Sequence, residues 1–226
     1  GAHRNLHSFP TRRSSDLGQR LDDAALMPMH NQQRLRQLVE ECLAMNPKPA
    51  FVANSGDTGD NGWTPLLMLY QRMMRPLVDG GIPVYTAVGN HDLDYAGIDE
   101  HDLGAIFEPL GPEKIGRHGT RYSFDFRGCH IIFMNNRPIS GLIRLDPADV
   151  AWLANDLRTV KKDTRVLLFL HANMPEEDTH HVAELLQPFS RAIVFQGHSH
   201  TESVEAWGNV PVDRKSTRLN SSHRIR

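Results

Sequence analysis

The sequence has only two cysteines in 226 residues, Cys42 and Cys129, so it carries no disulfide framework. Two buried free thiols are the simplest interpretation. No apolar run reaches the roughly eighteen residues of a membrane-spanning helix, and no signal-peptide pattern is visible. Residues 18–212 contain no internal repeat and no low-complexity stretch. These absences leave a globular domain whose 39% of hydrophobic residues suffices for a sizeable core, in a compartment that the sequence leaves open between cytoplasm, periplasm and secretion.

Both ends of the chain look foreign to it. Residues 7–17 and 213–223 resemble translated sequencing adapters, so we expect 1–17 and 213–226 to be artefactual and 18–212 to form the domain. The net charge of the whole chain is −2, but these two end segments carry eight basic and two acidic side chains, which leaves 18–212 with a net charge of −8. Since the basic excess lies in the suspect segments, we expect no nucleic-acid binding by a basic tail. An acidic domain is suited to gathering cations.

Apolar patterns predict an alternation of helices and strands. Helical spacing predicts helices over 29–45, 64–78, 101–107 and 179–186 and a further one beginning at Asp146-Pro147, whereas apolar runs predict strands over 50–55, 82–88, 121–126, 130–134, 166–170 and 192–195. The strand–helix–strand order around 64–78 predicts a parallel pair of strands, and the turn at Gly128 predicts a hairpin in a second sheet. The fold class is therefore α/β.

Polar residues follow four of these strands. They are Asp57, Asn90 with His91, His171, and His198 with His200. Parallel strands bring their carboxyl ends to one edge, so residues far apart in sequence converge there. Nitrogen and oxygen ligands without a thiolate suit Mn, Fe or Zn at a hydrolytic centre better than a structural zinc. A bridging carboxylate can hold two such ions roughly 3.5 to 4 Å apart, the spacing of two-metal hydrolases.

The ordered set of motifs resembles the calcineurin-like metallophosphoesterases. The resemblance covers about residues 29–207 and rests on Gly56-Asp57-x-x-Asp60, Gly89-Asn90-His91-Asp92, an isolated His171 after an apolar strand, and Gly197-His198-x-His200. The segment Tyr122-Ser-Phe-Asp-Phe126 and the segment Ala151–Leu157 are typical of bacterial members. The resemblance implies a two-sheet sandwich flanked by helices with a dinuclear metal site, here lacking its first strand and its C-terminal strands.

The resemblance also implies a role for each residue. Asp57 would bridge two divalent or trivalent ions (Mn, Fe or Zn); Asn90, His171 and His198 would complete one ion, and His200 would bind the other. His91 would stay off the metal and protonate the leaving alkoxide as the general acid, while Asp92 would orient its ring. Asp60 would shape the loop.

One family motif has no counterpart in the sequence. The family begins with a strand carrying Asp-x-His, which supplies two ligands to the ion of His200, and the nearby Asp22, Asp23 and His30 have the wrong spacing. The motif belongs where the adapter-like residues stand, so we expect truncation to have removed it and left one nearly complete site and half of another. The other histidines are not expected to bind metal: His180 and His181 on a solvated helix face, His101 and His118 in loops, and His130 pointing outward from a strand.

The sequence therefore predicts a metallophosphoesterase that hydrolyses a small phosphate mono- or diester through a metal-bridging hydroxide. Asp60, at a position where some phosphatase branches carry an aromatic residue, favours phosphodiesterases. The alternative is a non-catalytic metal-binding or interaction domain of the same fold, which the absence of Asp-x-His would permit. The oligomeric state is left open.

Overall fold

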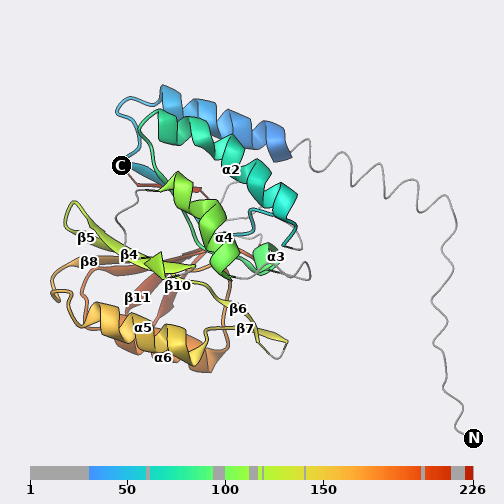
Figure 1. The fold of residues 1–226 in the computed structure, drawn as a ribbon. Coiled ribbons are helices and arrows are strands. Elements are labelled where there is room, and N and C mark those ends of the chain that lie inside the picture. The colour runs from blue at the N-terminus through green and yellow to red at the C-terminus, as the bar shows by residue number, and fades with distance from the viewer. Residues whose placement is uncertain are drawn as a thin grey trace, which may run out of the picture.

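The computed structural model describes residues 31–59, 62–93, 100–111, 117–118, 120–139, 141–199, 202–214 and 222–225. These residues form two sheets packed face to face, with helices on both outer faces (Figure 1). The two-sheet sandwich flanked by helices that the sequence predicts is thereby confirmed. No helix within the described residues has the length and hydropathy needed to cross a membrane.

The smaller sheet contains the predicted parallel pair of strands. β1 (Phe51–Asn54) pairs in parallel with β2 (Val84–Thr86), and β12 (Ser222–Ile225) pairs antiparallel with the other edge of β1. The connection between β1 and β2 is α2 (Thr64–Asp79), which begins with a proline in its first turn. Together with a helix over residues 31–44 and with α4 (Glu100–Phe107), α2 covers the outer face of this sheet.

The larger sheet has seven strands. Their order is β10 (Ser203–Trp207), β11 (Val210–Arg214), β9 (Ala192–Gln196), β8 (Arg165–Phe169), β5 (Cys129–Phe133), β4 (Arg121–Phe126) and β3 (Arg117–His118). The central strands β5, β8 and β9 are parallel, so their carboxyl ends share one edge. α5 (Pro147–Leu157), which is capped by the Asp146 side chain as predicted, and α6 (Glu176–Leu186) cover the outer face.

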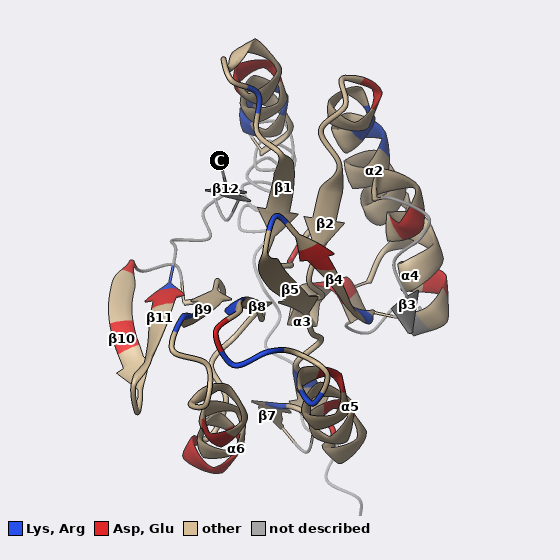
Figure 2. Ribbon diagram, turned by 90° about the vertical axis from the view of Figure 1, so that its left-hand side faces the viewer, with Lys and Arg blue, Asp and Glu red and all other residues tan. Residues whose placement is uncertain are grey.

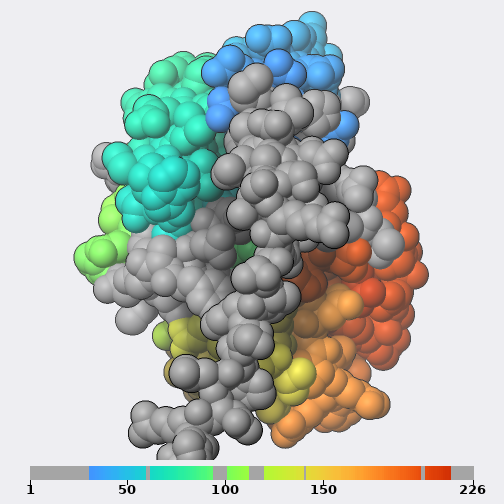
Figure 3. Space-filling model, turned by 90° about the vertical axis from the view of Figure 1, so that its right-hand side faces the viewer, coloured from blue at the N-terminus to red at the C-terminus, as the bar shows by residue number. Residues whose placement is uncertain are grey.

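Side-chain alternation along the strands divides the core between the layers. Phe51 of β1, Phe133 of β5 and Phe169 of β8 lie between the sheets, whereas Ile132 and Leu168 face the helices α5 and α6. Both faces of each central strand are covered, which explains why these strands are continuous apolar runs rather than alternating ones. Figure 3 shows a side on which the blue and green N-terminal half lies above the yellow-to-red C-terminal half.

Several short elements are not among those predicted from the sequence. The Gly-Asn-His-Asp turn forms a single helical turn, α3 (Asn90–Leu93), and η1 (Glu108–Leu110) extends α4. A small hairpin of β6 (Arg137–Ile139) and β7 (Leu142–Arg144) lies beside α3. The chain after the last predicted strand, from 203 to 214, forms β10 and β11 and so supplies two C-terminal strands to the large sheet.

Candidate metal centre

The loops that follow β1 and β2 meet through two glycines. Gly56 has a φ of +101°, and a Cβ at this position would lie 2.6 Å from the Gly89 backbone nitrogen. A Cβ on Gly89 would collide with the Asp57 carboxylate. Glycine at both positions thus lets the two loops approach, and the His91 backbone N–H donates to Asp57 Oδ1 at 3.1 Å.

Asp92 joins the same two loops through its buried carboxylate. Its Oδ2 accepts hydrogen bonds from the backbone N–H groups of Asp57 and Gly89, both at 2.9 Å. Its Oδ1 accepts from the Thr58 backbone at 2.7 Å, the Thr58 hydroxyl at 2.8 Å and the Gly59 backbone at 2.9 Å. The sequence predicts that Asp92 orients the ring of His91, but these five bonds engage the carboxylate fully, so it positions the loop that carries Asp57.

His171 follows β8 and is completely buried. Its Nδ1 lies 2.8 Å from the carbonyl oxygen of Ser55, which fixes Nδ1 as the donor and links the two sheets. Its Nε2 consequently points away from Ser55, 3.1 Å from Asp57 Oδ2 and 3.2 Å from His198 Nδ1. A ligating histidine is commonly held in this way, with one nitrogen donating to a carbonyl and the other facing the ion.

Asp57, His171 and His198 together present one ligand atom each within 4.8 Å of one another. They come from three different strand ends, as the sequence predicts. Asp57 and His198 have φ values of +56° and +64°, a region that residues other than glycine seldom occupy. Two of the three candidate ligands thus sit on strained backbone, a feature that clusters at functional sites.

Asn90 offers a fourth oxygen. Its side-chain Oδ1 is buried and, within the described part of the chain, accepts no hydrogen bond. A buried amide oxygen without a donor costs about 1 to 3 kcal/mol, and a cation would relieve that cost. This unpartnered oxygen and the converging carboxylate and imidazoles fit a divalent cation with mixed nitrogen and oxygen ligands.

The charges in the cluster are tightly coupled. Burial raises the pKa of Asp57, but the hydrogen bond and the charge of His171 outweigh burial and hold it below its ordinary value of 3.8. Burial lowers the pKa of His171, yet Asp57 brings it above 6.5. For Asp92, burial raises the pKa, with the Asp57 charge adding to this and the hydrogen bonds from the loop opposing it. Protons and metal ions therefore compete for the Asp57–His171 pair.

Not every predicted site residue can be compared with the structure. His91 lies on α3 with an exposed side chain, and its carbonyl accepts from the Gly62 N–H at 2.8 Å. His200 and Asp60 lie outside the described residues.

Two polar residues that the sequence analysis missed hold the loop of His171. Asn136 Oδ1 accepts from the backbone N–H groups of His171 at 3.0 Å and Ala172 at 3.2 Å, and its Nδ2 donates to the Ala172 carbonyl at 2.6 Å. Gln196 Nε2 donates to the same carbonyl at 3.0 Å. Both are buried, and Asn136 lies three residues after the end of β5. A polar residue at the end of an apolar strand, the signal that identified the ligands, also marks Asn136.

The prediction for His130 is wrong. Its side chain does not point into solvent but is buried, 6% exposed, between Asp125 of β4 and Asp156 of α5. Its Nδ1 and Nε2 each lie 2.8 Å from one of these carboxylates. The outward face of β5 is covered by α5, so an outward-pointing residue there is still buried. His101, His180 and His181 are exposed, the last two as predicted.

The converging side chains form a candidate metal site at the edge of an α/β sandwich. The sequence model of the calcineurin-like phosphoesterase family matches residues 14–202. The chain therefore belongs to this family, and the predicted resemblance is confirmed. Members of the family are in general metal-dependent phosphoester hydrolases. No curated protein sequence matches the chain.

Solved structures similar to this fold include three hydrolases. The phosphopantetheinyl hydrolase PptH from Mycobacterium tuberculosis is 12% identical, with 76% of this chain and 84% of that chain covered and a TM-score of 0.47. The sulfate thiohydrolase SoxB from Thermus thermophilus, in complex with glycerol, is 14% identical, with coverages of 81% and 36% and a TM-score of 0.44. A putative 5′-nucleotidase from Staphylococcus aureus is 16% identical, with coverages of 68% and 34% and a TM-score of 0.36.

Proposed function

We propose that this protein hydrolyses a small phosphate mono- or diester with the help of metal ions. Family membership supports the reaction class. The observation that carries the proposal is the convergence of Asp57, His171 and His198 from three strand ends, within 4.8 Å, beside the unpartnered oxygen of Asn90.

In this proposal Asp57, Asn90, His171 and His198 would hold one ion, and His200 with Asp57 would help to hold a second one. Bound divalent ions supply Lewis-acid activation of the phosphoryl group and of the attacking water. The chain itself orients the side chains that would bind the ions. The Ser55 carbonyl fixes the tautomer of His171, and the Asp92 carboxylate holds the backbone on both sides of Asp57 in place before any ion arrives.

His91 is the proposed general acid. Its side chain is exposed, while its backbone is held next to Asp57 by the N–H donated to that carboxylate. An exposed imidazole at the rim of the cluster suits proton transfer to a leaving oxygen. Asp92 acts on this step only through the loop that it positions.

The test of His91 uses a series of aryl phosphodiesters whose leaving phenols differ in acidity, assayed with Mn²⁺. Protonation matters most for poor leaving groups, so His91→Ala should lower kcat about 10² to 10⁴-fold for the least acidic phenol and much less for p-nitrophenol. Metal content should stay unchanged. The exposed His101→Ala on α4 is the matched control, and it should behave as the wild type. An equal loss for all leaving groups would contradict the proposed role.

The same assay separates the enzyme from the alternative, a non-catalytic metal-binding domain. Such a domain would bind Mn²⁺ at the Asp57–His171–His198 cluster and show no turnover with any ester in the series. Turnover with any ester of the series would reject the non-catalytic alternative.

A further inference from the structure

The edge of the large sheet opposite the candidate metal centre carries a cluster of cations. Their residues belong to the β4–β5 turn, to the segment between α5 and β8, and to the turn before β9, and they are Arg127, Arg158, Lys161, Lys162, Arg165 and Arg191. We call this set the basic edge. Figure 2 shows these loops in blue in front of the sheet.

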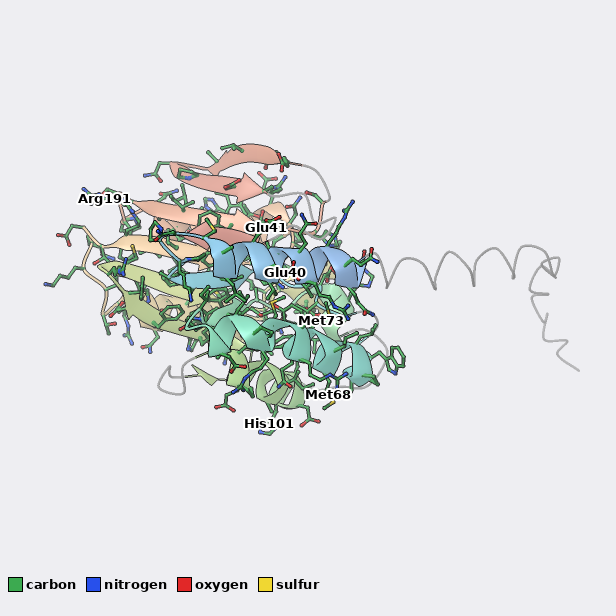
Figure 4. The ribbon with its side chains drawn as sticks, turned by 90° about the horizontal axis from the view of Figure 1, so that it is seen from above. Glu40, Glu41, Met68, Met73, His101 and Arg191 are labelled. Atoms are coloured by element: carbon green, nitrogen blue, oxygen red, sulfur yellow. The ribbon has the colours of Figure 1, made fainter. Side chains whose placement is uncertain are left out.

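The strand registers bring these residues together. Arg165 at the start of β8 is in register with Cys129, two residues after Arg127, and the Val166 N–H donates to the carbonyl of Arg191 at 3.3 Å. The turns before β5, β8 and β9 therefore lie side by side, because neighbouring strands of a sheet are about 4.8 Å apart. Figure 4 labels Arg191 at the outer edge of the molecule.

All six side chains of the basic edge are exposed, and among the described residues none of them forms an ion pair. This is unlike other arginines of the molecule, such as Arg121, Arg137 and Arg144, each of which is paired with an aspartate. Asp163 is the one exposed acid inside the segment from 158 to 165, and the nearby Asp125 is engaged by His130. A chain with net charge −2 thus concentrates unpaired positive charge on one edge.

The basic edge has few features that would read a nucleic acid. Its cations lie in turns and at the start of β8, and none of them lies within a helix of the kind that enters a groove. Its two nearby rings, Phe126 and Phe189, are covered by Arg127 at 5.2 Å and Lys162 at 4.1 Å and offer no open face for a base. The exposed large apolar residues, such as Trp63 and Val204, lie on other elements. The basic edge therefore offers a partner positive charge and no stacking or apolar contacts.

A flat anionic surface suits this arrangement better than a flexible polyanion. The acidic excess lies elsewhere, for example on the helix over 31–44 at Glu40 and Glu41 (Figure 4) and on α6 at Glu176 and Glu177. Glu176 and Glu177 follow β8 and so lie roughly 17 Å from a plane touching the basic edge, the length of a five-residue strand, which exceeds the Debye length of about 8 to 10 Å. A flexible polyanion that wrapped around the molecule would meet them.

We propose that the basic edge docks the protein onto an anionic phospholipid surface. The strands between the two edges are five residues long, so the candidate metal centre would stand roughly 17 Å farther from the lipid than the basic edge. The site then opens away from the bilayer, where a soluble phosphate ester can reach it.

The test measures co-sedimentation of the full chain with vesicles of phosphatidylserine and phosphatidylcholine, compared with vesicles of phosphatidylcholine alone. Binding should require phosphatidylserine and weaken as salt rises. Each cation near such a surface contributes about a fivefold factor, so replacing three of them by glutamine, Arg127→Gln with Arg165→Gln and Arg191→Gln, should weaken binding about a hundredfold. Replacing the same three by lysine should preserve binding.

A matched triple variant with Arg34→Gln, Arg36→Gln and Arg72→Gln removes three exposed cations from the helical layer and should bind as the wild type does. Equal melting temperatures of the variants confirm that folding is intact. Binding that survives in the edge variant would assign it to other cations, including those in 1–30 and 215–226, and would overturn the proposal. Edge-dependent binding to an oligonucleotide without binding to vesicles would overturn it as well.

Discussion

His171 and His130 are both buried histidines of the large sheet, and their surroundings differ in one decisive respect. His171 donates through Nδ1 to the Ser55 carbonyl and turns Nε2 towards a carboxylate and a second imidazole on the same side. His130 has a carboxylate at each nitrogen, Asp125 at one and Asp156 at the other. Both nitrogens of His130 are thus used as donors, whereas His171 keeps one nitrogen directed at a point where ligands converge.

Burial alone does not identify a metal ligand. Two imidazoles and a carboxylate that face one point form an arrangement that a cation completes, because each of them can donate an electron pair to it. An imidazole between two carboxylates donates a proton to each of them as an imidazolium. Its positive charge then balances the carboxylates without a metal ion. The property to test is therefore whether the second nitrogen of the histidine faces a point where other ligand atoms converge.

Turnover should separate the two histidines most strongly. His171→Ala removes a proposed ligand, so kcat/KM for bis-p-nitrophenyl phosphate with Mn²⁺ should fall about 10³-fold or more, the scale of several kcal/mol of lost metal assistance. His130→Gln should keep the wild-type value. Comparable losses in both variants would break the distinction.

Asp92 tests whether the loop geometry beside His171 matters before metal binds. Asp92→Ala leaves four backbone N–H groups without their acceptor, so the Asp57 loop should lose its fixed position. Metal affinity should fall about 10 to 100-fold, as for other residues that hold ligands in place. Competition with a chromogenic chelator measures it, with Asp102→Ala on α4 as the control. An unchanged affinity would show that the loop is rigid without Asp92.

Replacing His130 should instead change the free energy of unfolding and its dependence on pH. Burial lowers the pKa of His130, but its bonds to Asp156 and Asp125 raise it above 6.5 overall. A raised folded-state pKa stabilises the fold fully below about pH 6.5, and this contribution is lost as the pH rises through the folded-state pKa. Urea unfolding of His130→Gln should therefore show a deficit of about 1 to 3 kcal/mol at pH 6 that shrinks at alkaline pH. A deficit that grows with pH would contradict the imidazolium assignment.

Ser123 offers the smallest and most local test. Its hydroxyl donates to Asp156 Oδ1 at 2.7 Å, on the carboxylate that also holds His130. Ser123→Ala should lower the free energy of unfolding by about 1 kcal/mol and leave turnover intact. The exposed Ser190→Ala is the matched control. A loss of activity in Ser123→Ala would mean that this network reaches the metal centre.

Much of this site can be predicted from the sequence because short local motifs indicate its residues. Asp57, Asn90 and His171 each follow an apolar run, and the helix between β1 and β2 predicts the parallel pair that brings Asp57 and Asn90 together. The role of Asp92 is not local, since its acceptor sites are matched by donors 33 to 35 residues away. No pattern in the sequence shows which backbone groups will need an acceptor.

Each element that the sequence did not predict correctly has a physical reason of its own. His130 was expected to face solvent because residues alternate along a strand, but a central strand of a layered fold has no solvent-facing side. The hairpin β6–β7 has strands of only three residues, too short for a periodic pattern. Asn136 and Gln196 act through the backbone of the His171 loop, which sequence spacing does not display.

The coordination shell of the metal-loaded protein tests the central claim most directly. X-ray absorption at the metal edge of Zn²⁺-loaded protein should show imidazole nitrogen and oxygen scatterers at about 2.0 to 2.2 Å and no sulfur at about 2.3 Å. The imidazole contribution should decrease in His171→Gln and stay unchanged in His130→Gln. A shell without imidazole, or one altered by His130→Gln and not by His171→Gln, would contradict the account.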